Sequence, residues 1–412
     1  SGPQPQGGRT LVSAGAVRVC TPLVGLGDPD RPATVRVDTA PRLAQEAEAR
    51  EGCMKQGFSL IVPTWGRSEA VLARLFDSLA RLAPAERRLI VEVVLADQNT
   101  PPLDHRKLLS GPAKKVFAHL SLDGNSGKGR IARPGAGKVP LLHCVGLAPS
   151  VTRSKNLAVS LSSAPWLLFL DDDVAVLPGC LRIHAQIRRK CTGLGGLGGR
   201  ETVIAPDGSE QPGESGLDRL VARFYARRSA EQAWLWQGRF VGRVTRQSFF
   251  LCDYSLPVVG HVRADVVRGC HWSLGREAFE TVGGFDTGYQ GTALREESEM
   301  QLRVQSAGYE NRFTGDARVL HYRGAGGCRN LSGTLGVLRS KLVNETRFQL
   351  QHFRRPIVLF FALRILPHVI GSLRSTRGLS PFLWLQAISR FWYLKHFNQA
   401  RERWLRKPDA GR

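Results

Sequence analysis

Five apolar residues run directly into three aspartates in the stretch Trp166-Leu167-Leu168-Phe169-Leu170-Asp171-Asp172-Asp173. The apolar part has the length of a buried β-strand. Three consecutive carboxylates repel one another and raise each other's pKa unless a cation neutralises them. A hard divalent cation with carboxylate and phosphate oxygens as ligands meets that need. A solvated turn or a helix N-terminus is the plainer alternative, but the position after a buried strand favours a metal site.

Two apolar runs earlier in the chain end in polar residues in the same way. They predict strands over 58–62, followed by Pro63-Thr64, and over 89–96, followed by Asp97. Helical patterns lie over 68–82 and 152–161. Strands that alternate with helices predict an α/β fold with an open, mostly parallel sheet flanked by helices. We therefore expect the polar strand ends to converge on one crevice at the carboxyl edge of that sheet.

A second acidic cluster, Glu296-Glu297, begins an amphipathic helix that is predicted to end near Gly308. Acidic residues in a first helical turn usually serve only to offset the helix dipole. The pair gains weight from the preceding Gly283-Gly284-Phe285-Asp286 and from the later His321. This part of the chain then offers both a candidate general base and a candidate metal ligand.

Taken in order, these segments resemble the inverting glycosyltransferases of family 2, which have the GT-A fold. The resemblance covers about residues 58–329. Phe58-Ser59-Leu60-Ile61-Val62-Pro63-Thr64 is similar to the first strand of the family, and Arg153-Ser154-Lys155-Asn156 is similar to its Ala-Arg-Asn-x-Gly helix. Phe169-Leu170-Asp171-Asp172-Asp173 looks like its DXD motif.

The later part of the chain carries the rest of the resemblance. Glu296-Glu297-Ser298-Glu299-Met300-Gln301-Leu302-Arg303 resembles the Glu-Asp-x-Asp-Leu-x-x-Arg segment, and Val319-Leu320-His321 resembles the segment with the late metal-ligand histidine. The chain departs from the family pattern at three places. Trp65-Gly66-Arg67 replaces the usual Tyr-Asn-Arg, Glu297 stands where Asp is commoner, and His271 stands where Asn is frequent.

The resemblance implies metal-dependent transfer of a sugar, with inversion, from a nucleotide-diphosphate donor to a hydroxyl acceptor that is a glycan or lipid-linked. Asp173 and His321 would hold Mn²⁺ or Mg²⁺, and Glu297 would be the general base. His271, Trp272 and Glu296 would contact the acceptor. The residues expected to bind the donor are Pro63, Thr64, Arg67, Asp97, Arg153, Asn156, Asp171, Asp172 and Arg329. Of these, Arg329 is as readily interpreted as a solvent-facing loop residue.

The composition adds a strong positive charge. The 412 residues include 58 Lys and Arg against 35 Asp and Glu, which gives a formal net charge of +23. Such a charge implies an anionic partner. Without an RNP, zinc-finger or helix-turn-helix signature, nucleic acid is not expected to be that partner. The eight cysteines form no CxxC pair, which suits buried thiols in a reducing cytosol, and we expect no signal peptide.

The chain divides into three predicted parts. Residues 1–55 are an extension of uncertain structure, 56–330 form the catalytic domain, and 331–412 form a basic amphipathic helical segment. Arginines interrupt the apolar runs of the last segment, so neither run is long enough to span a bilayer. We expect the segment to lie on an anionic membrane surface, which predicts a cytoplasmic protein peripheral on the inner face of the cell membrane. The alternative is that it packs on the catalytic domain.

Two glycine-rich stretches invite a phosphate-loop interpretation. Gly124-Asn125-Ser126-Gly127-Lys128-Gly129 and Gly135-Ala136-Gly137-Lys138 both lack the required spacing, since Val139 follows Lys138 where a hydroxyl residue should stand. We interpret them as a mobile basic loop.

Two other functions compete with sugar transfer. A nucleotidyltransferase on a related sheet could use strand-end aspartates and a metal in the same way. A basic protein that binds lipid or nucleic acid without catalysis would explain the charge but would not need the aspartates.

Overall fold

The computed structural model describes residues 57–123, 137–211, 234–245, 250–322, 326–327 and 333–352. Four predictions therefore lie outside the described residues, wholly or nearly so: the extension 1–55, the glycine-rich loop that begins at Gly124, Arg329, and the tail from 353 onward. Within the described part of the chain, no helix is both long and apolar enough to cross a membrane.

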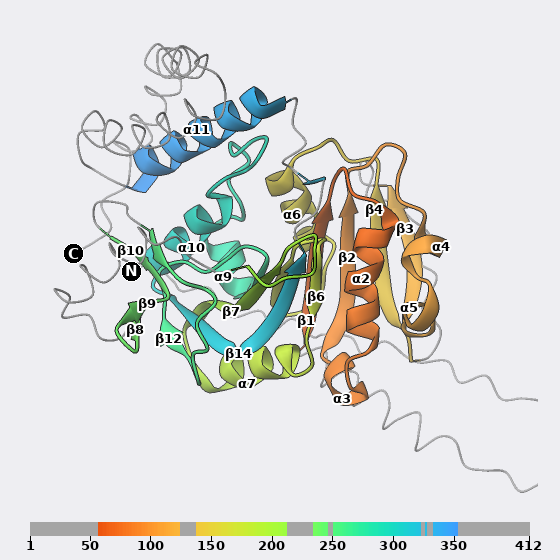
Figure 1. Cartoon of the computed structure of the whole chain (residues 1–412), viewed down its shortest axis with the longest axis horizontal. Helices are drawn as coiled ribbons and strands as arrows, with labels where there is room; N and C mark the ends of the chain where they lie inside the picture. The colour runs from red at the N-terminus through yellow and green to blue at the C-terminus, as the bar shows by residue number, and fades with distance from the viewer. Residues whose placement is uncertain are drawn as a thin grey trace, which may run out of the picture. The chain divides into compact units, whose positions relative to one another are not determined.

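A ten-stranded mixed sheet organises the fold (Figure 1). Its strand order is β12-β14-β7-β13-β5-β1-β2-β4-β3, and β6 pairs with β14 off this path. One half is entirely parallel and contains β5 (Trp166–Leu170), β1 (Phe58–Thr64), β2 (Ile90–Asp97), β4 (Val139–Val145) and β3 (Phe117–Asp123). The other half contains β13 (His271–Gly275), β7 (Leu194–Ile204), β14 (Glu310–Tyr322), β12 (Val262–Arg263) and β6 (Val174–Val176).

The second half mixes both strand directions. β13 is antiparallel to β5 on one side and to β7 on the other, whereas β14 runs parallel to β7. The prediction of an α/β fold with a mostly parallel open sheet between helices is confirmed. Two small hairpins complete the strands, β8 (Leu235–Trp236) with β9 (Arg239–Phe240) and β10 (Gly242–Val244) with β11 (Phe250–Cys252).

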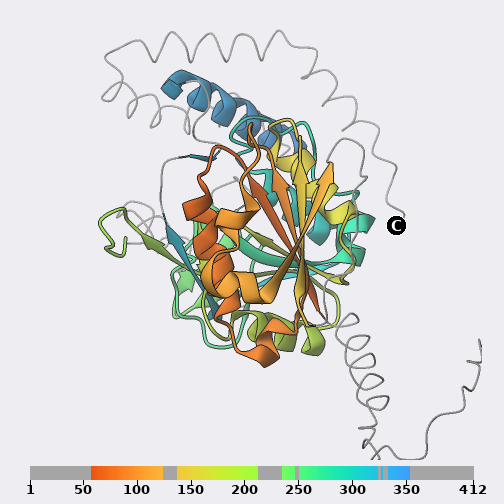
Figure 2. The same cartoon turned by 90° about the vertical axis from the view of Figure 1, so that its right-hand side faces the viewer.

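Helices cover both faces of the sheet (Figure 2). One face packs against α2 (Glu69–Ala80) and α7 (Cys180–Lys190), and the other packs against α6 (Val151–Ser160), α9 (Arg276–Thr281) and α10 (Glu296–Ser306). The central strand β5 shows why a continuous apolar run is needed there. Leu168 and Leu170 belong to the first apolar cluster, and Leu167 and Phe169 belong to the second. Because alternate side chains point to opposite faces, a strand covered on both sides must be apolar throughout.

Three short helices, α3 (Pro84–Arg87), α4 (His105–Leu108) and α5 (Gly111–Val116), complete the parallel half. The last described helix, α11 (Gly333–His352), packs on the loop that precedes α10. Arg347 binds the Asp286 carboxylate at 2.9 Å, Arg295 binds Glu345 at 2.8 Å, and Phe348 is fully buried. For this first part of the segment after residue 330, the structure shows the packing arrangement that the sequence left as the alternative.

Candidate metal and ligand site

The predicted acidic clusters meet in one cavity of about 380 Å³ at the carboxyl ends of β1 and β5. The strand register explains the convergence, because Thr64 pairs with Asp97 and Ile61 pairs with Phe169, two residues before Asp171. Nine of the predicted site residues line the cavity: Pro63, Thr64, Arg67, Asp171, Asp172, Asp173, Glu296, Glu297 and His321. The expected crevice at the strand ends is therefore present.

Three side chains in this cavity form a candidate metal site. Ligand atoms of Asp171, Asp173 and His321 all lie within 4.8 Å of one another, and His321 Nε2 lies 3.0 Å from Asp173 Oδ1. β14 brings the histidine to the aspartates because it pairs with β6, which begins directly after Asp173. Two carboxylates and one imidazole are donors that suit Mn²⁺, and the carboxylates also suit Mg²⁺. The donor set thus fits the predicted cation, with Asp171 added to the two expected ligands.

The pKa values of the three candidate ligands are set by burial, by neighbouring charges and by hydrogen bonds. Burial and the neighbouring Asp173 raise the pKa of Asp171. Burial would also raise the pKa of Asp173, but the hydrogen bond from His321 and the charge of Arg67 hold it below its usual value. Burial would lower the pKa of His321, but hydrogen bonds to Asp173, Cys270 and Glu201 raise it well above its usual value. A metal ion would take over the role that the positively charged ring plays for these carboxylates.

Asp172 points to a different set of partners. Its carboxylate accepts hydrogen bonds from Thr64 Oγ1 at 2.8 Å and from Arg67 Nε at 3.1 Å. Arg67 also donates a short hydrogen bond to Asp173. Burial raises the pKa of Asp172 to about 7, although Arg67 opposes the shift. Thr64 and Arg67, predicted as donor contacts, thus also hold the aspartates in place.

The second cluster contains a buried contact between a lysine and a glutamate that the sequence interpretation missed. Lys155 Nζ lies 2.5 Å from Glu296 Oε1, and both side chains are nearly inaccessible to solvent. Burial raises the pKa of Glu296 to about 8, against the opposing charge of Lys155. A signal was available, because Thr152, Lys155 and Val159 lie on one face of α6 and are all buried. A lysine on the apolar face of a predicted helix is a candidate for a buried partner.

Glu297, the predicted base, lines the cavity at the start of α10. Its carboxylate lies over Gly269, where a Cβ would come 2.9 Å from Glu297 Cδ. Side chains essentially never approach that closely, so a glycine at 269 leaves the space that the carboxylate occupies. The sequence interpretation did not include Gly269 among the site residues.

A second missed residue, Glu201 on β7, lies behind the metal site. Its Oε1 lies 2.5 Å from His321 Nδ1, and its Oε2 lies 2.9 Å from Arg268 Nε. The only sequence signal is an acidic residue two positions after the glycine-rich run 194–199, and the structure shows that Glu201 is buried in the same strand as that run. β7 pairs with β14 and so places Glu201 beside the histidine.

Three predicted donor contacts do not line the cavity. The Asp97 carboxylate is fully buried and accepts hydrogen bonds from Leu103 N at 2.7 Å and from His143 Nε2 at 2.9 Å. Asn156 exchanges hydrogen bonds with the backbone of Phe285, and Arg153 is exposed on α6. The structure therefore gives Asp97 and Asn156 roles in holding loops near the site.

The expectation that His271 and Trp272 contact the acceptor is corrected. Both side chains are 0% exposed. As neighbours on β13 they point to opposite faces of the sheet, where His271 contacts Cys180 on α7 and Trp272 stacks on Phe169. Both faces are covered, so neither side chain reaches the cavity.

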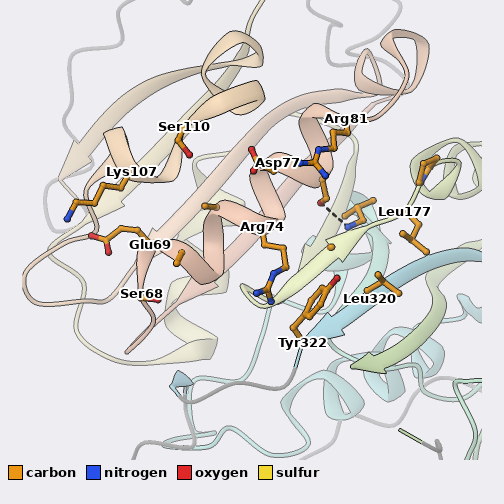
Figure 3. Close-up of a pocket in the computed structure, with 16 residues that line it drawn as sticks. Ser68, Glu69, Arg74, Asp77, Arg81, Lys107, Ser110, Leu177, Leu320 and Tyr322 are labelled. Carbon is orange, nitrogen blue, oxygen red and sulfur yellow. Dashed lines mark hydrogen bonds between the residues drawn. The ribbon is translucent and has the colours of Figure 1, made fainter. Parts of the chain in front are cut away.

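A larger cavity of about 890 Å³ lies between α2 and the β6–β14 pair (Figure 3). The Arg74 guanidinium stacks on the Tyr322 ring with 4.0 Å to its centroid, and Arg81 and Lys107 also line the cavity. None of the predicted site residues lines this cavity. Tyr322 follows His321 directly, so the two cavities lie on either side of the end of β14.

Comparisons with known proteins find similarity to solved structures. No family model matches the chain, and no curated protein matches it. A crystal structure of GalNAc-T7 with UDP, GalNAc and Mn²⁺ is similar to this chain with a TM-score of 0.49 and 16% sequence identity. The match covers 75% of this chain and 50% of the other, so this chain spans about half the length of that solved protein.

Proposed function

We propose that the protein is a metal-dependent inverting glycosyltransferase that moves a sugar from a nucleoside-diphosphate donor to a hydroxyl acceptor. One observation carries the proposal: two acidic clusters more than 120 residues apart in sequence meet His321 in a single cavity at the strand ends. Together with the ordered motifs, this arrangement supports membership of family 2 and the GT-A fold. Assembly of polysaccharide, glycolipid or another glycan is the class of process that fits.

Asp171, Asp173 and His321 would hold Mn²⁺ or Mg²⁺, which neutralises the charge of the departing diphosphate when bound. Arg67, which contacts both Asp172 and Asp173, fixes the orientation of the aspartates. The residues of β1 that line the cavity, Pro63 and Thr64, would contact the donor. Binding of the donor at the carboxyl edge of the sheet follows the general rule for open α/β sheets.

Glu297 would accept the proton of the acceptor hydroxyl. The acceptor oxygen forms a bond to the anomeric carbon while the bond from that carbon to the diphosphate oxygen breaks, and the electron pair leaves with the diphosphate. Attack from the face opposite the leaving group inverts the anomeric centre. General-base help of this kind is typically worth about 10²–10⁴ in rate. The Lys155–Glu296 pair anchors the start of α10 and thereby positions Glu297.

The proposal extends to the location of the protein. A cytoplasmic, peripheral position on the inner face of the membrane would follow if the basic residues of 353–412 bind anionic lipid. The support is the sequence of that segment alone. Binding of the full chain, and of a chain ending at His352, to vesicles with and without anionic lipid tests it. Equal binding of both chains would contradict the proposal.

Product analysis separates the proposed reaction from nucleotidyl transfer. Purified protein is incubated with a panel of sugar nucleotides and acceptors in the presence of Mn²⁺. Release of nucleoside diphosphate together with a glycosylated acceptor supports sugar transfer, whereas release of pyrophosphate indicates nucleotidyl transfer.

Variants then test the assigned residues. Glu297→Gln should abolish transfer and leave Mn²⁺ and donor binding intact, and Asp173→Asn should weaken Mn²⁺ binding itself. Glu277→Gln changes an exposed carboxylate on α9 and is the matched control. Turnover of Glu297→Gln equal to that of Glu277→Gln would remove Glu297 from the role of base.

A further inference from the structure

Three side chains converge between α7 and the sheet, away from the cavity described above. Cys180 and His184 are four residues apart on α7 and so share one face of the helix. His271 is the first residue of β13. His271 Nε2 lies 3.1 Å from Cys180 Sγ and 3.0 Å from His184 Nε2, and all three residues are 0% exposed. One sulfur and two imidazole nitrogens thus face a common point in the interior.

Both imidazoles are neutral at physiological pH. Burial lowers the pKa of His271 to about 4 and lowers that of His184 well below its usual value. Burial raises the pKa of the Cys180 thiol above its usual range. Neutral imidazoles keep the lone pair that a metal requires, and the thiol keeps its proton until a metal ion displaces it.

The second nitrogen of His184 is held from outside the trio. Its Nδ1 lies 2.8 Å from Ser273 Oγ, which also accepts a hydrogen bond from Arg188 Nε at 2.8 Å. A partner on the outer nitrogen fixes the ring orientation and leaves the inner nitrogen pointing to the centre, as in metal sites. Ser273 lies on β13 and Arg188 lies on α7, the same two elements that carry the three proposed ligands.

Hydrogen bonds among Cys180, His184 and His271 cannot pair all of their inward-facing polar atoms. Two Nε2 atoms that face each other can share only one proton, and the Cys180 sulfur competes for the same His271 nitrogen.

We propose that Cys180, His184 and His271 bind one thiophilic d¹⁰ metal ion, with Cu⁺ favoured over Zn²⁺. Binding replaces the thiol proton, which leaves for solvent, by a bond between the sulfur and the metal, and no oxidation is involved. Thiolate and imidazole ligands select Cu⁺ and Zn²⁺, whereas Mg²⁺ and Mn²⁺ prefer oxygen.

Charge decides between the two ions. A thiolate with Cu⁺ is neutral, but with Zn²⁺ the site keeps a positive charge close to the buried Arg188. An unbalanced charge in the interior is costly. Three ligands, all buried, also suit the low coordination number of Cu⁺.

Such an ion would tie α7 to β13. Asp171 N donates a hydrogen bond to the carbonyl of Cys270, which is the residue before His271. The Cys180–His184–His271 site is therefore connected through the backbone to the aspartates proposed to bind Mn²⁺ or Mg²⁺. An ion that binds only the folded chain stabilises it by mass action. The inference does not depend on the proposed sugar transfer.

Metal content of the full chain tests the proposal. The protein is produced with added copper or with added zinc, purified without oxygen, passed through a desalting column with EDTA, and analysed by elemental mass spectrometry. We expect one equivalent of copper per chain in the wild type, lost in Cys180→Ser and in His184→Gln. Cys144→Ser removes another fully buried thiol, on β4, and should retain the metal. Asp173→Asn should retain it too.

Three outcomes would overturn the inference: no metal retained by the wild type, equal retention by Cys180→Ser, or an X-ray absorption spectrum of the loaded wild type without a sulfur ligand. The spectrum needs no variant, so the test survives if Cys180→Ser fails to fold. A shell of one sulfur and two nitrogens supports the site. Retention of zinc but not copper supports the site and overturns the charge argument.

Discussion

His321 is held between two carboxylates: its Nδ1 lies 2.5 Å from Glu201 Oε1, and its Nε2 lies 3.0 Å from Asp173 Oδ1. The two contacts use opposite sides of one ring, so the Glu201 contact fixes which nitrogen faces the metal site. Carboxylate–histidine–metal arrangements orient the ring and make it a better ligand. Glu201 is in turn held by Arg268. We therefore assign Glu201 as a positioning residue for His321, the proposed metal ligand.

Glu201→Gln should weaken Mn²⁺ binding by about 10–100-fold, because partners of ligating histidines typically contribute that much. Calorimetric titration with Mn²⁺ measures the change. Glu310→Gln, at a partly exposed carboxylate on β14 that pairs with Arg312, should leave the affinity unchanged. An unaltered affinity in Glu201→Gln would mean that Asp173 alone orients the ring.

Gly269→Ala should lower the turnover number while leaving Mn²⁺ and donor binding near their wild-type values. The added methyl group would lie 2.9 Å from Glu297 Cδ and 3.1 Å from Cγ, so the carboxylate must shift from its position in the cavity. A misplacement of about 1 Å can cost about 10²-fold in rate. Gly275→Ala, at the other end of β13, adds a methyl group that meets only the Leu194 carbonyl at 4.0 Å. Steady-state kinetics of both variants test this prediction. Equal turnover numbers for Gly269→Ala and Gly275→Ala would mean that Gly269 has no role in placing the Glu297 carboxylate.

The strand ends were predictable from sequence, but which residues pair behind them was not. A buried apolar run followed by aspartates predicts β5 and the place of the acidic cluster from local sequence alone. Lys155 and Glu201 act through contacts with Glu296 and His321, 141 and 120 residues away in sequence. Such contacts depend on the order of strands in the sheet, which hydrophobic periodicity does not encode.

The error at His271 and Trp272 has the same origin. The acceptor role of these two residues was inferred from the family resemblance alone. In the structure β13 is inserted between β5 and β7, which covers both faces of the strand. Only the register of β13 reveals that these two side chains are core residues.

Asp97→Asn should destabilise the protein at neutral pH. Burial would raise the pKa of Asp97, but hydrogen bonds from His143, Leu103 and Asn99 hold it below its usual 3.8. The stabilisation is therefore present above pH 3.8 and is lost as pH falls through the lower folded value. Hydrogen bonds to a charged group are worth about 1.5–3 kcal/mol each, so a loss of a few kcal/mol is expected at about pH 7.

Urea unfolding of the wild type and of Asp97→Asn at about pH 7 and about pH 3.5 measures the difference. The gap between the two proteins should narrow at the lower pH. Asp207→Asn, which changes a fully exposed carboxylate, should show little effect at either pH. A gap that does not change with pH would indicate that Asp97 acts through packing and not through its charge.

Lys155→Met should change how the free energy of unfolding depends on pH. The stability of the wild type should stop falling above about pH 8, whereas that of the variant should continue to fall. In the wild type, the Glu296 carboxyl has a pKa of about 8 in the folded state and about 4.5 in the unfolded chain. The folded state therefore holds a proton that the unfolded state lacks, and stability falls between those values. Without Lys155 the folded pKa rises further, because burial is then unopposed. Above pH 8 the deficit of the variant should grow by about 1.4 kcal/mol per pH unit.

Urea unfolding at about pH 8 and about pH 9 measures this growth. Methionine nearly matches the length of the lysine stem but lacks the ammonium, which lies 5.1 Å from the centroid of the Phe285 ring and 5.9 Å from that of Phe169, so the change of charge dominates. The double variant Lys155→Met/Glu296→Gln carries no titrating group at this position, and its deficit should not depend on pH. A deficit of Lys155→Met that is the same at both values would mean that Glu296 is already ionised without its partner. The lysine would then act by filling space on the buried face of α6 and not by supporting a charge.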